Sequence, residues 1–396
     1  MLIGSTVRKV KKVELTSGGY PIIFTHVGVG DKGNTDEMIE VERAKIAGAI
    51  SLGTDVICDV SMAKNLKEVH PKLMEGFDVP FGVVTAYECY IEAEKDNLKC
   101  SASKCIETFK EEVLRGFDII TIHATVFKND LEYIKQSNRI ISTTSRGGML
   151  MLKLMETNGY ENPFYTHFDE ILKICKEYEV ALSLGPCYRP ASVCDCDAND
   201  ILTRLELERM AVLVNKANEY GVGIAIEGIG HAPLNKIPEM INLAKSLCDN
   251  AVYRVMTVAT DVALGYDHIA SAISSAMAIY CGADSITCVT RSEHIGIPSL
   301  EEVLEGVKVA KVAAHSGWIA RTGDLYKDEK MSKAREKHGC IGHIPSTLFP
   351  DDVIKTIRDK ESKRAGKSCT MCGDYCPLNR LGSEDYGENW FIWSKP

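Results

Sequence analysis

One strand–helix–strand unit stands out in residues 180–226, which read VALSLGPCYRPASVCDCDANDILTRLELERMAVLVNKANEYGVGIAI. The apolar runs Val180–Leu184 and Gly223–Ile226 have the length of buried strands, and Ala198–Tyr220 between them has the spacing of an amphipathic helix. Continuous apolar strands joined by helices are typical of a parallel sheet that helices cover. This unit predicts an α/β fold.

The same alternation continues along most of the chain. Seven further segments are predicted to be strands: Pro21–Val27, Asp55–Val60, Phe81–Ala86, Asp118–Ala124, Arg139–Thr144, Tyr253–Ala259 and Ser285–Val289. Eight strand–helix repeats would close a (β/α)8 barrel, so one of the nine candidates is a rim element or not a strand. A doubly wound open sheet is the alternative, but no G-x-G-x-x-G follows the first candidate strand, which disfavours it.

The end of the barrel is predicted from one helix. Ser299 and Glu302 form a capping box at its start, and Gly317 is expected to end it. Beyond it, residues 320–367 are rich in charge. We therefore predict a barrel over residues 1–316 and a helical C-terminal region with a cysteine-rich tail over residues 317–396.

Three cysteines lie close together in that tail. Cys369, Cys372 and Cys376 are spaced C-x2-C-x3-C. Three neighbouring thiols cannot all pair as disulfides, whereas three thiolates can hold three irons of a [4Fe-4S] cluster and leave the fourth iron open. S-adenosylmethionine is a ligand suited to an open iron. A zinc knuckle is the alternative, but a fourth ligand is not evident nearby.

Composition excludes several classes of protein. The chain has 396 residues and a net charge of -9, so no basic surface indicates a nucleic-acid partner. No signal peptide or apolar run of transmembrane length is present, so we expect no membrane partner and a cytoplasmic location. The 15 cysteines are expected to be mostly reduced thiols there.

Polar residues follow the predicted strands one after another. They include Asp59, Tyr87, His123, Ser145, Arg146, Gly147, Arg189, Glu227, His231, Asp261, Glu293 and His294. A barrel gathers the carboxyl ends of its strands at one face, where such enzymes have their active sites. We expect these side chains to surround one site.

Two of these segments have a specific chemistry. Ser145-Arg146-Gly147-Gly148 offers backbone amides, a hydroxyl and a guanidinium, which suit a phosphate, although a plain Gly-Gly turn is the alternative. His231 and His294 are candidate imidazole ligands of one divalent metal, with positions left for water or substrate.

Several motifs occur together in the order found in one known family. They are Thr121-Ile-His-Ala, Thr144-Ser-Arg-Gly-Gly, Glu161-Asn-Pro-Phe-Tyr-Thr-His-Phe-Asp-Glu, Ser183-Leu-Gly with Arg189-Pro, Glu227-Gly-Ile-Gly-His-Ala-Pro-Leu, Thr260-Asp-Val-Ala-Leu-Gly-Tyr-Asp-His-Ile and Val289-Thr-Arg-Ser-Glu-His-Ile-Gly-Ile-Pro. From about Asp118 to Ser316, and in the terminal cysteines, the chain resembles the phosphomethylpyrimidine synthases of thiamine biosynthesis and the related 5-hydroxybenzimidazole synthase. The resemblance implies a radical S-adenosylmethionine lyase on a (β/α)8 barrel. Such an enzyme rearranges aminoimidazole ribonucleotide, takes electrons from an external donor, and is a homodimer in which each tail reaches over the partner's barrel.

The resemblance also implies a role for individual residues. His123 would contact the substrate, with Tyr87 as a weaker match. Ser145, Arg146 and Gly147 would hold the substrate's phosphate. Arg189 and Glu227 would bind its ribose or imidazole, which makes Glu227 and His123 the catalytic candidates. His231 and His294 would hold zinc, and Cys369, Cys372 and Cys376 would ligate the [4Fe-4S] cluster.

The chain departs from the family's pattern in three places. The family's cysteines are spaced C-x2-C-x4-C, its first strand carries Asn-Ala-Asn-Ile-Gly where this chain has Thr25-His-Val-Gly-Val, and its Asp-Gly-Leu-Arg-Pro-Gly is here Pro186-Cys-Tyr-Arg-Pro-Ala. The last two departures fall where the substrate would bind, so the chain resembles a divergent paralog.

Three functions therefore stay open at this point. The first is a radical enzyme acting on aminoimidazole ribonucleotide or a similar phosphorylated ribonucleotide, with a 5-hydroxybenzimidazole synthase as a related possibility. The second is a metal-dependent barrel lyase or hydrolase without a radical step. The third is a binding protein that has kept the phosphate site and lost the chemistry.

Overall fold

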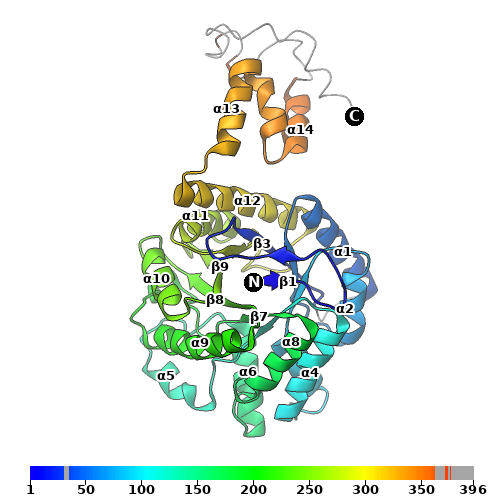
Figure 1. Ribbon diagram of the computed structural model, residues 1–396, viewed down its shortest axis with the longest axis vertical. Helices are drawn as coiled ribbons and strands as arrows, with labels where there is room; N and C mark the ends of the chain where they lie inside the picture. Colours follow the sequence, from blue (N-terminus) through cyan, green and yellow to red (C-terminus); the bar gives the residue numbers. More distant parts are fainter. Residues whose placement is uncertain (31–34, 362–370, 373–374, 376–396) are drawn as a thin grey trace. The chain divides into compact units, whose positions relative to one another are not determined.

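The computed structural model describes residues 1–30, 35–361, 371–372 and 375 (Figure 1). The chain divides into two compact units, residues 1–321 and residues 322–396.

The first unit is built on a closed barrel of eight parallel strands (Figure 1). The strands are β3 (Ile22–Val27), β4 (Val56–Asp59), β5 (Phe81–Val84), β6 (Ile119–Ile122), β7 (Ala181–Leu184), β8 (Ile224–His231), β9 (Val252–Val258) and β10 (Ser285–Thr287). Each strand pairs with the next in sequence, and β10 pairs with β3, where Ser285 lies opposite Ile22. The predicted (β/α)8 barrel is confirmed.

The strands are apolar because both of their faces are covered. Every residue of β4, β6 and β7 is buried. One face of each strand packs inside the barrel and the other packs under the helices, as in other all-parallel sheets. This explains why the strands appear in the sequence as continuous apolar runs.

A layer of helices surrounds the barrel (Figure 1). They are α1 (Thr35–Ser51), α2 (Leu66–Met74), α3 (Thr85–Glu94), α4 (Ala102–Arg115), α5 (Leu131–Gln136), α6 (Arg146–Asn158), α7 (Pro163–Thr166), α8 (Phe168–Tyr178), α9 (Ile201–Tyr220), α10 (Ile237–Leu247), α11 (Asp267–Tyr280) and α12 (Leu300–Thr322). Two short 3-10 helices, η1 (Lys128–Asp130) and η2 (Val193–Asp195), lie in the loops. The side chains of Ser101, Ser145 and Asp200 cap α4, α6 and α9 by accepting a backbone N–H three residues on.

The ninth predicted strand, Arg139–Thr144, is wrong. The segment is a loop between α5 and α6, and its Ile140 side chain is 75% exposed. The backbone amides of Ile140 and Ile141 donate to the Asp195 carboxylate at 2.8 and 3.0 Å instead of to a neighbouring strand. A side chain from η2 therefore takes the place of a strand partner.

The expected helix end at Gly317 is also wrong, although the capping box between Ser299 and Glu302 is present. Helix α12 continues through Gly317 to Thr322. A β-carbon at Gly317 would lie 2.6 Å from the carbonyl oxygen of Ala276 on α11. The glycine thus serves the close packing of two helices and does not stop one.

A short hairpin covers the amino-terminal end of the barrel. Strands β1 (Leu2–Ile3) and β2 (Val13–Glu14) pair antiparallel. Ile3 and Leu15 pack with residues near the beginnings of the barrel strands, among them Phe24, Ile119 and Ala225. The candidate site lies at the opposite end of the barrel, at the carboxyl ends of the strands.

The second unit is helical where it is described. It contains α13 (Tyr326–His338), η3 (Gly339–Ser346) and α14 (Pro350–Glu361). Within the described residues of the whole chain, no helix combines the length and the apolar character that crossing a bilayer requires.

Candidate functional site

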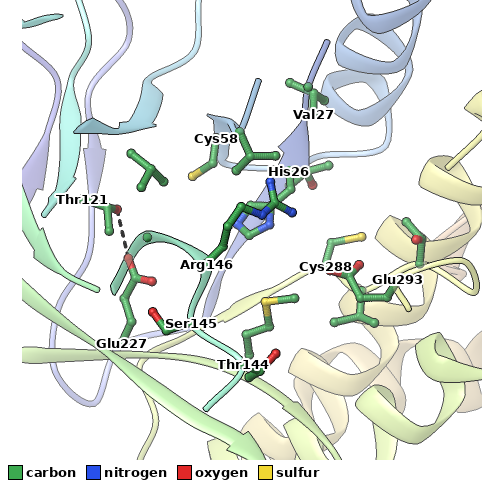
Figure 2. Close-up of a pocket in the computed structure, with 18 of the residues that line it drawn as sticks. His26, Val27, Cys58, Thr121, Thr144, Ser145, Arg146, Glu227, Cys288 and Glu293 are labelled. Atoms are coloured by element: carbon green, nitrogen blue, oxygen red, sulfur yellow. Dashed lines mark hydrogen bonds between the residues drawn. The ribbon is translucent and has the colours of Figure 1, made fainter. Parts of the chain in front are cut away.

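A cavity of about 640 Å³ lies at the carboxyl ends of the barrel strands (Figure 2). Asp59 and Asp261, two of the polar residues predicted to surround the site, are not among the residues that line it. The other ten line it: Tyr87, His123, Ser145, Arg146, Gly147, Arg189, Glu227, His231, Glu293 and His294. They come from different strands and loops, so the barrel brings together groups that lie up to about two hundred residues apart. Their positions agree with the predicted site, while their roles stay predictions.

The floor of the cavity consists of Glu227, Arg254 and His26. Glu227 Oε1 accepts a hydrogen bond from the Thr121 hydroxyl at 3.0 Å (Figure 2). It also accepts one from the Ser183 hydroxyl at 2.6 Å and lies 3.3 Å from Arg254 Nη1. Burial alone would raise the pKa of Glu227, but Arg254 and the Ser183 hydroxyl outweigh it and lower the pKa to about 2. Glu227 is therefore a carboxylate at neutral pH.

Arg254 holds the floor together. Its Nε donates to Thr287 Oγ1 at 3.0 Å, its Nη2 lies 3.0 Å from His26 Nε2, and its guanidinium lies 4.4 Å from the centre of the Phe24 ring. Burial lowers the pKa of His26 to about 3, and the charge of Arg254 adds to the shift. His26 is therefore neutral at physiological pH.

A second group of residues, here called the α6 corner, consists of Ser145, Arg146, Gly147, His123 and Arg189. Ser145 caps α6 by accepting from the backbone N–H of Gly148 at 3.1 Å, so the first turn of this 13-residue helix opens at the cavity. The Arg146 guanidinium lies over the Tyr87 ring, 5.2 Å from its centre. A helix N-terminus with an arginine beside it attracts anions.

Two buried groups of the α6 corner lack a partner among the described residues. They are Arg189 Nε and His123 Nδ1. Among the described residues, the hydrogen-bond partner of Arg189 Nη1 is the thioether of Met256 at 3.9 Å, which is a weak acceptor. Buried polar groups are normally hydrogen-bonded, so these atoms mark a place where a ligand would bind.

His123 stands between two glycines. A β-carbon at Gly147 would lie 2.5 Å from His123 Nδ1, and one at Gly185 would lie 2.8 Å from His123 Nε2. Burial lowers the pKa of His123 to about 4, so the ring is neutral. Glycine at both positions is what allows the ring to enter the cavity wall.

His231 and His294 lie side by side at the other side of the cavity, with ring centres 5.0 Å apart. His231 Nδ1 bonds Asp261 Oδ1 at 2.7 Å, and His294 Nδ1 bonds Asp267 Oδ1 at 3.0 Å. When Nδ1 bonds a carboxylate, Nε2 is left as the metal-binding atom, which is the usual arrangement for histidine ligands. The pair fits a divalent metal that keeps open positions for water or substrate.

The described residues contain no group of three or more His, Cys, Asp or Glu side chains placed to hold a metal. Cys372 of the predicted cluster segment is described and exposed, while Cys369 and Cys376 lie outside the described residues.

Sequence reasoning missed several residues that line the cavity. The main ones are His26, Cys58, Arg254 and Cys288, from strands β3, β4 and β9 and the end of β10. Arg254 and His26 stand inside segments that were correctly predicted as strands. The available signal was a charged or titratable side chain inside an otherwise apolar parallel strand, which needs a partner there.

Comparison with known proteins identifies relatives over most of the chain. The profile of the Radical SAM ThiC family matches residues 22–382. The phosphomethylpyrimidine synthase of Carboxydothermus hydrogenoformans is 36% identical over 88% of this chain and 82% of the relative. Those of Thermus thermophilus and Methanopyrus kandleri are also 36% identical, over 86% and 87% of this chain and 78% and 81% of the relatives.

Among solved structures, a dihydropteroate synthase from Xanthomonas albilineans matches with a TM-score of 0.44 and 13% identity, covering 78% of this chain and 98% of that protein. That level of similarity supports no conclusion about this chain. The profile match and the 36% identities each extend over most of the chain and therefore show its family. The chain belongs to the Radical SAM ThiC family and is a radical S-adenosylmethionine enzyme.

Proposed function

We propose that the chain is a carbon–carbon lyase that rearranges aminoimidazole ribonucleotide, or a closely similar phosphorylated ribonucleotide, to a pyrimidine phosphate of the thiamine type. One observation carries the proposal. A single cavity joins the α6 corner, with its unpartnered donors, to a floor with an ionised carboxylate. A phosphate at one side and a polar heterocycle at the other would match this arrangement.

The α6 corner would bind the phosphate. The free amides of the first turn of α6 and the Arg146 guanidinium supply donors, and Ser145 orients that turn by capping it. Arg189 and His123 would satisfy their unpartnered nitrogens on the ribose or on the phosphate. Each of these two nitrogens would gain the hydrogen bond that it lacks without a ligand, and both gains would favour binding.

The floor would orient the heterocycle. Glu227 Oε1 accepts hydrogen bonds from Thr121 and Ser183 and lies 3.3 Å from Arg254 Nη1, whereas Oε2 has no hydrogen bond among the described residues. Since Glu227 is ionised, Oε2 can accept a hydrogen bond from a ring amine or a ribose hydroxyl. The carboxylate cannot rotate freely, because two hydroxyl donors and the nearby charge of Arg254 fix its other oxygen.

His231 and His294 would hold one divalent metal, proposed to be zinc. Their Nδ1 atoms are engaged by Asp261 and Asp267, which suits ligation through Nε2. Such a metal would supply a Lewis acid that positions and polarises a ligand atom. Asp261→Asn and Asp267→Asn should each weaken zinc binding about 10- to 100-fold in a competition titration with a chelator.

Cys369, Cys372 and Cys376 would hold a [4Fe-4S] cluster. Three thiolates are the donor set that leaves one iron open, and the Cys372 side chain is exposed. The bound cluster and S-adenosylmethionine would supply the radical chemistry, with electrons from an external donor. We also propose a homodimer as the working assembly.

The decisive experiment is anaerobic incubation of the reconstituted protein with S-adenosylmethionine, dithionite and aminoimidazole ribonucleotide, with mass spectrometry of the products. A phosphorylated hydroxymethylpyrimidine is the expected product, whereas hydroxybenzimidazole would indicate the related synthase. Turnover that persists in a Cys369→Ala, Cys372→Ala double variant would favour the non-radical lyase and contradict the proposal. Failure to cleave S-adenosylmethionine in a fully reconstituted sample would also contradict it.

A further inference from the structure

His26 is a titratable side chain on the cavity floor to which the proposed function assigns no role. It lies on β3, in an otherwise apolar strand that reads Ile-Ile-Phe-Thr-His-Val, and it lines the cavity (Figure 2). Its Nε2 lies 3.0 Å from Arg254 Nη2. Within the described part of the chain, its ring makes no other hydrogen bond.

The contact with Arg254 determines where the proton of His26 lies. A guanidinium can only donate hydrogen bonds, so Nε2 must be the acceptor in this pair. A neutral imidazole has one acceptor nitrogen and one N–H, and its proton is therefore on Nδ1. The ring presents a single N–H donor, and it cannot also serve as an acceptor through that atom.

Arg254 also keeps the ring in place. The guanidinium is fixed by Thr287 Oγ1, by the face of Phe24 and by Glu227. The same guanidinium thus contacts the Glu227 carboxylate at Oε1 and the His26 ring at Nε2, which leaves Oε2 as an acceptor and Nδ1–H as a donor. A donor and an acceptor are held on one rigid support, which is how a site reads the edge of a heterocycle.

We propose that His26 is a specificity-determining residue whose Nδ1–H donates to an acceptor atom of the substrate's heterocycle, while Glu227 Oε2 accepts from a donor on the same ring. The class of ring that satisfies both is a nitrogen heterocycle with an unprotonated ring nitrogen and an exocyclic amine. This inference rests on the proposed function and names what the floor selects. His26 also lies in the first-strand segment where this chain differs from the family's pattern. The proposal therefore states how that difference would affect substrate recognition.

Two substitutions separate the donor role from the contact with Arg254. In His26→Gln, the side-chain oxygen can take the place of Nε2 beside Arg254, but the Nδ1–H donor is lost. In His26→Asn, an amide N–H stands near the position of Nδ1, but the acceptor for Arg254 is lost. Binding of aminoimidazole ribonucleotide and of ribose 5-phosphate would be measured by calorimetry on the wild type and both variants, with urea unfolding as a check of the fold.

We expect His26→Gln to bind aminoimidazole ribonucleotide about tenfold more weakly, as for one lost hydrogen bond, with unchanged affinity for ribose 5-phosphate. His26→Asn should keep most of the ribonucleotide affinity. Equal ribonucleotide affinity in wild type and His26→Gln would overturn this inference and leave the proposed function standing, and so would equal losses for both ligands. Wild-type protein that does not bind the ribonucleotide at all would overturn the proposed function together with the inference.

Discussion

The floor and the α6 corner of the cavity differ in how far their polar side chains are paired with one another. On the floor, Arg254 contacts both Glu227 and His26, and its Nη1, which lacks a hydrogen-bond partner among the described residues, still lies 3.3 Å from the Glu227 carboxylate. In the α6 corner, Arg189 Nε and His123 Nδ1 are buried without a partner among the described residues. The difference indicates that the protein fixes the floor in advance, whereas a ligand would complete the corner.

The sharpest way to break this comparison is to remove the cation from the floor. Arg254→Met should lower the free energy of unfolding by about 3–5 kcal/mol, because it leaves a buried carboxylate unpaired. Urea unfolding would measure the loss. In the double variant with Glu227→Gln the two losses should not add, and strict additivity would show that the floor is not one unit.

Lowering the pH should reduce the stability of the folded protein, and part of that loss should depend on His26. The pKa of His26 is lowered from 6.5 to about 3, so below pH 6.5 the unfolded chain takes up a proton that the folded protein does not. Stability is therefore lost as the pH falls, by about 2–3 kcal/mol for this group between pH 6.5 and pH 4.5. In His26→Gln that part of the loss should be absent, as measured by urea midpoints at both pH values. Parallel pH profiles for the two proteins would contradict a neutral His26.

A larger side chain at Gly147 tests how tightly the α6 corner is packed. Gly147→Ala should destabilise the protein by about 1–3 kcal/mol and abolish ribonucleotide binding, because the new methyl group would occupy the place of the His123 ring. Gly296→Ala is the matched control, since Gly296 also lines the cavity and has nothing within 4 Å of a β-carbon. Thermal unfolding and calorimetry would measure both effects. Similar results for the two variants would show that the corner is not tightly packed.

The smallest expected effect on stability belongs to Arg189. Arg189→Gln should change the free energy of unfolding by less than about 0.5 kcal/mol, because its buried nitrogen has no partner to lose among the described residues. Ribonucleotide affinity should nevertheless fall at least about tenfold. A loss of stability as large as that of Arg254→Met would erase the distinction between corner and floor.

Much of the barrel was predictable, because parallel strands buried on both faces appear in the sequence as apolar runs. Eight of the nine predicted strands overlap the eight strands of the barrel. Arg139–Thr144 was misread because a β-like composition does not reveal whether a strand partner or a side chain such as Asp195 takes its amides. A single segment cannot show that choice, which depends on a loop some fifty residues away.

The candidate site was predictable in part for a similar reason. Residues after the strand ends, such as Arg189 and His231, stand out against the strands before them, and the barrel does bring them to one cavity. Arg254 and His26 were missed because they lie inside strands. Arg254 on β9 lies opposite Glu227 on the neighbouring strand β8, and it reaches His26 on β3 across β10. A linear sequence does not display this arrangement of the strands.

The position of the His123 ring between Gly147 and Gly185 limits how this site can evolve. The imidazole occupies the volume that a β-carbon would need at either glycine, so none of the three positions can change alone without disturbing the others. A smaller residue at 123 would release both glycines at once, and a side chain at either glycine would require a smaller residue at 123. The three positions should therefore be inherited together, and a relative that lacks one of them should be examined for compensating changes at the other two.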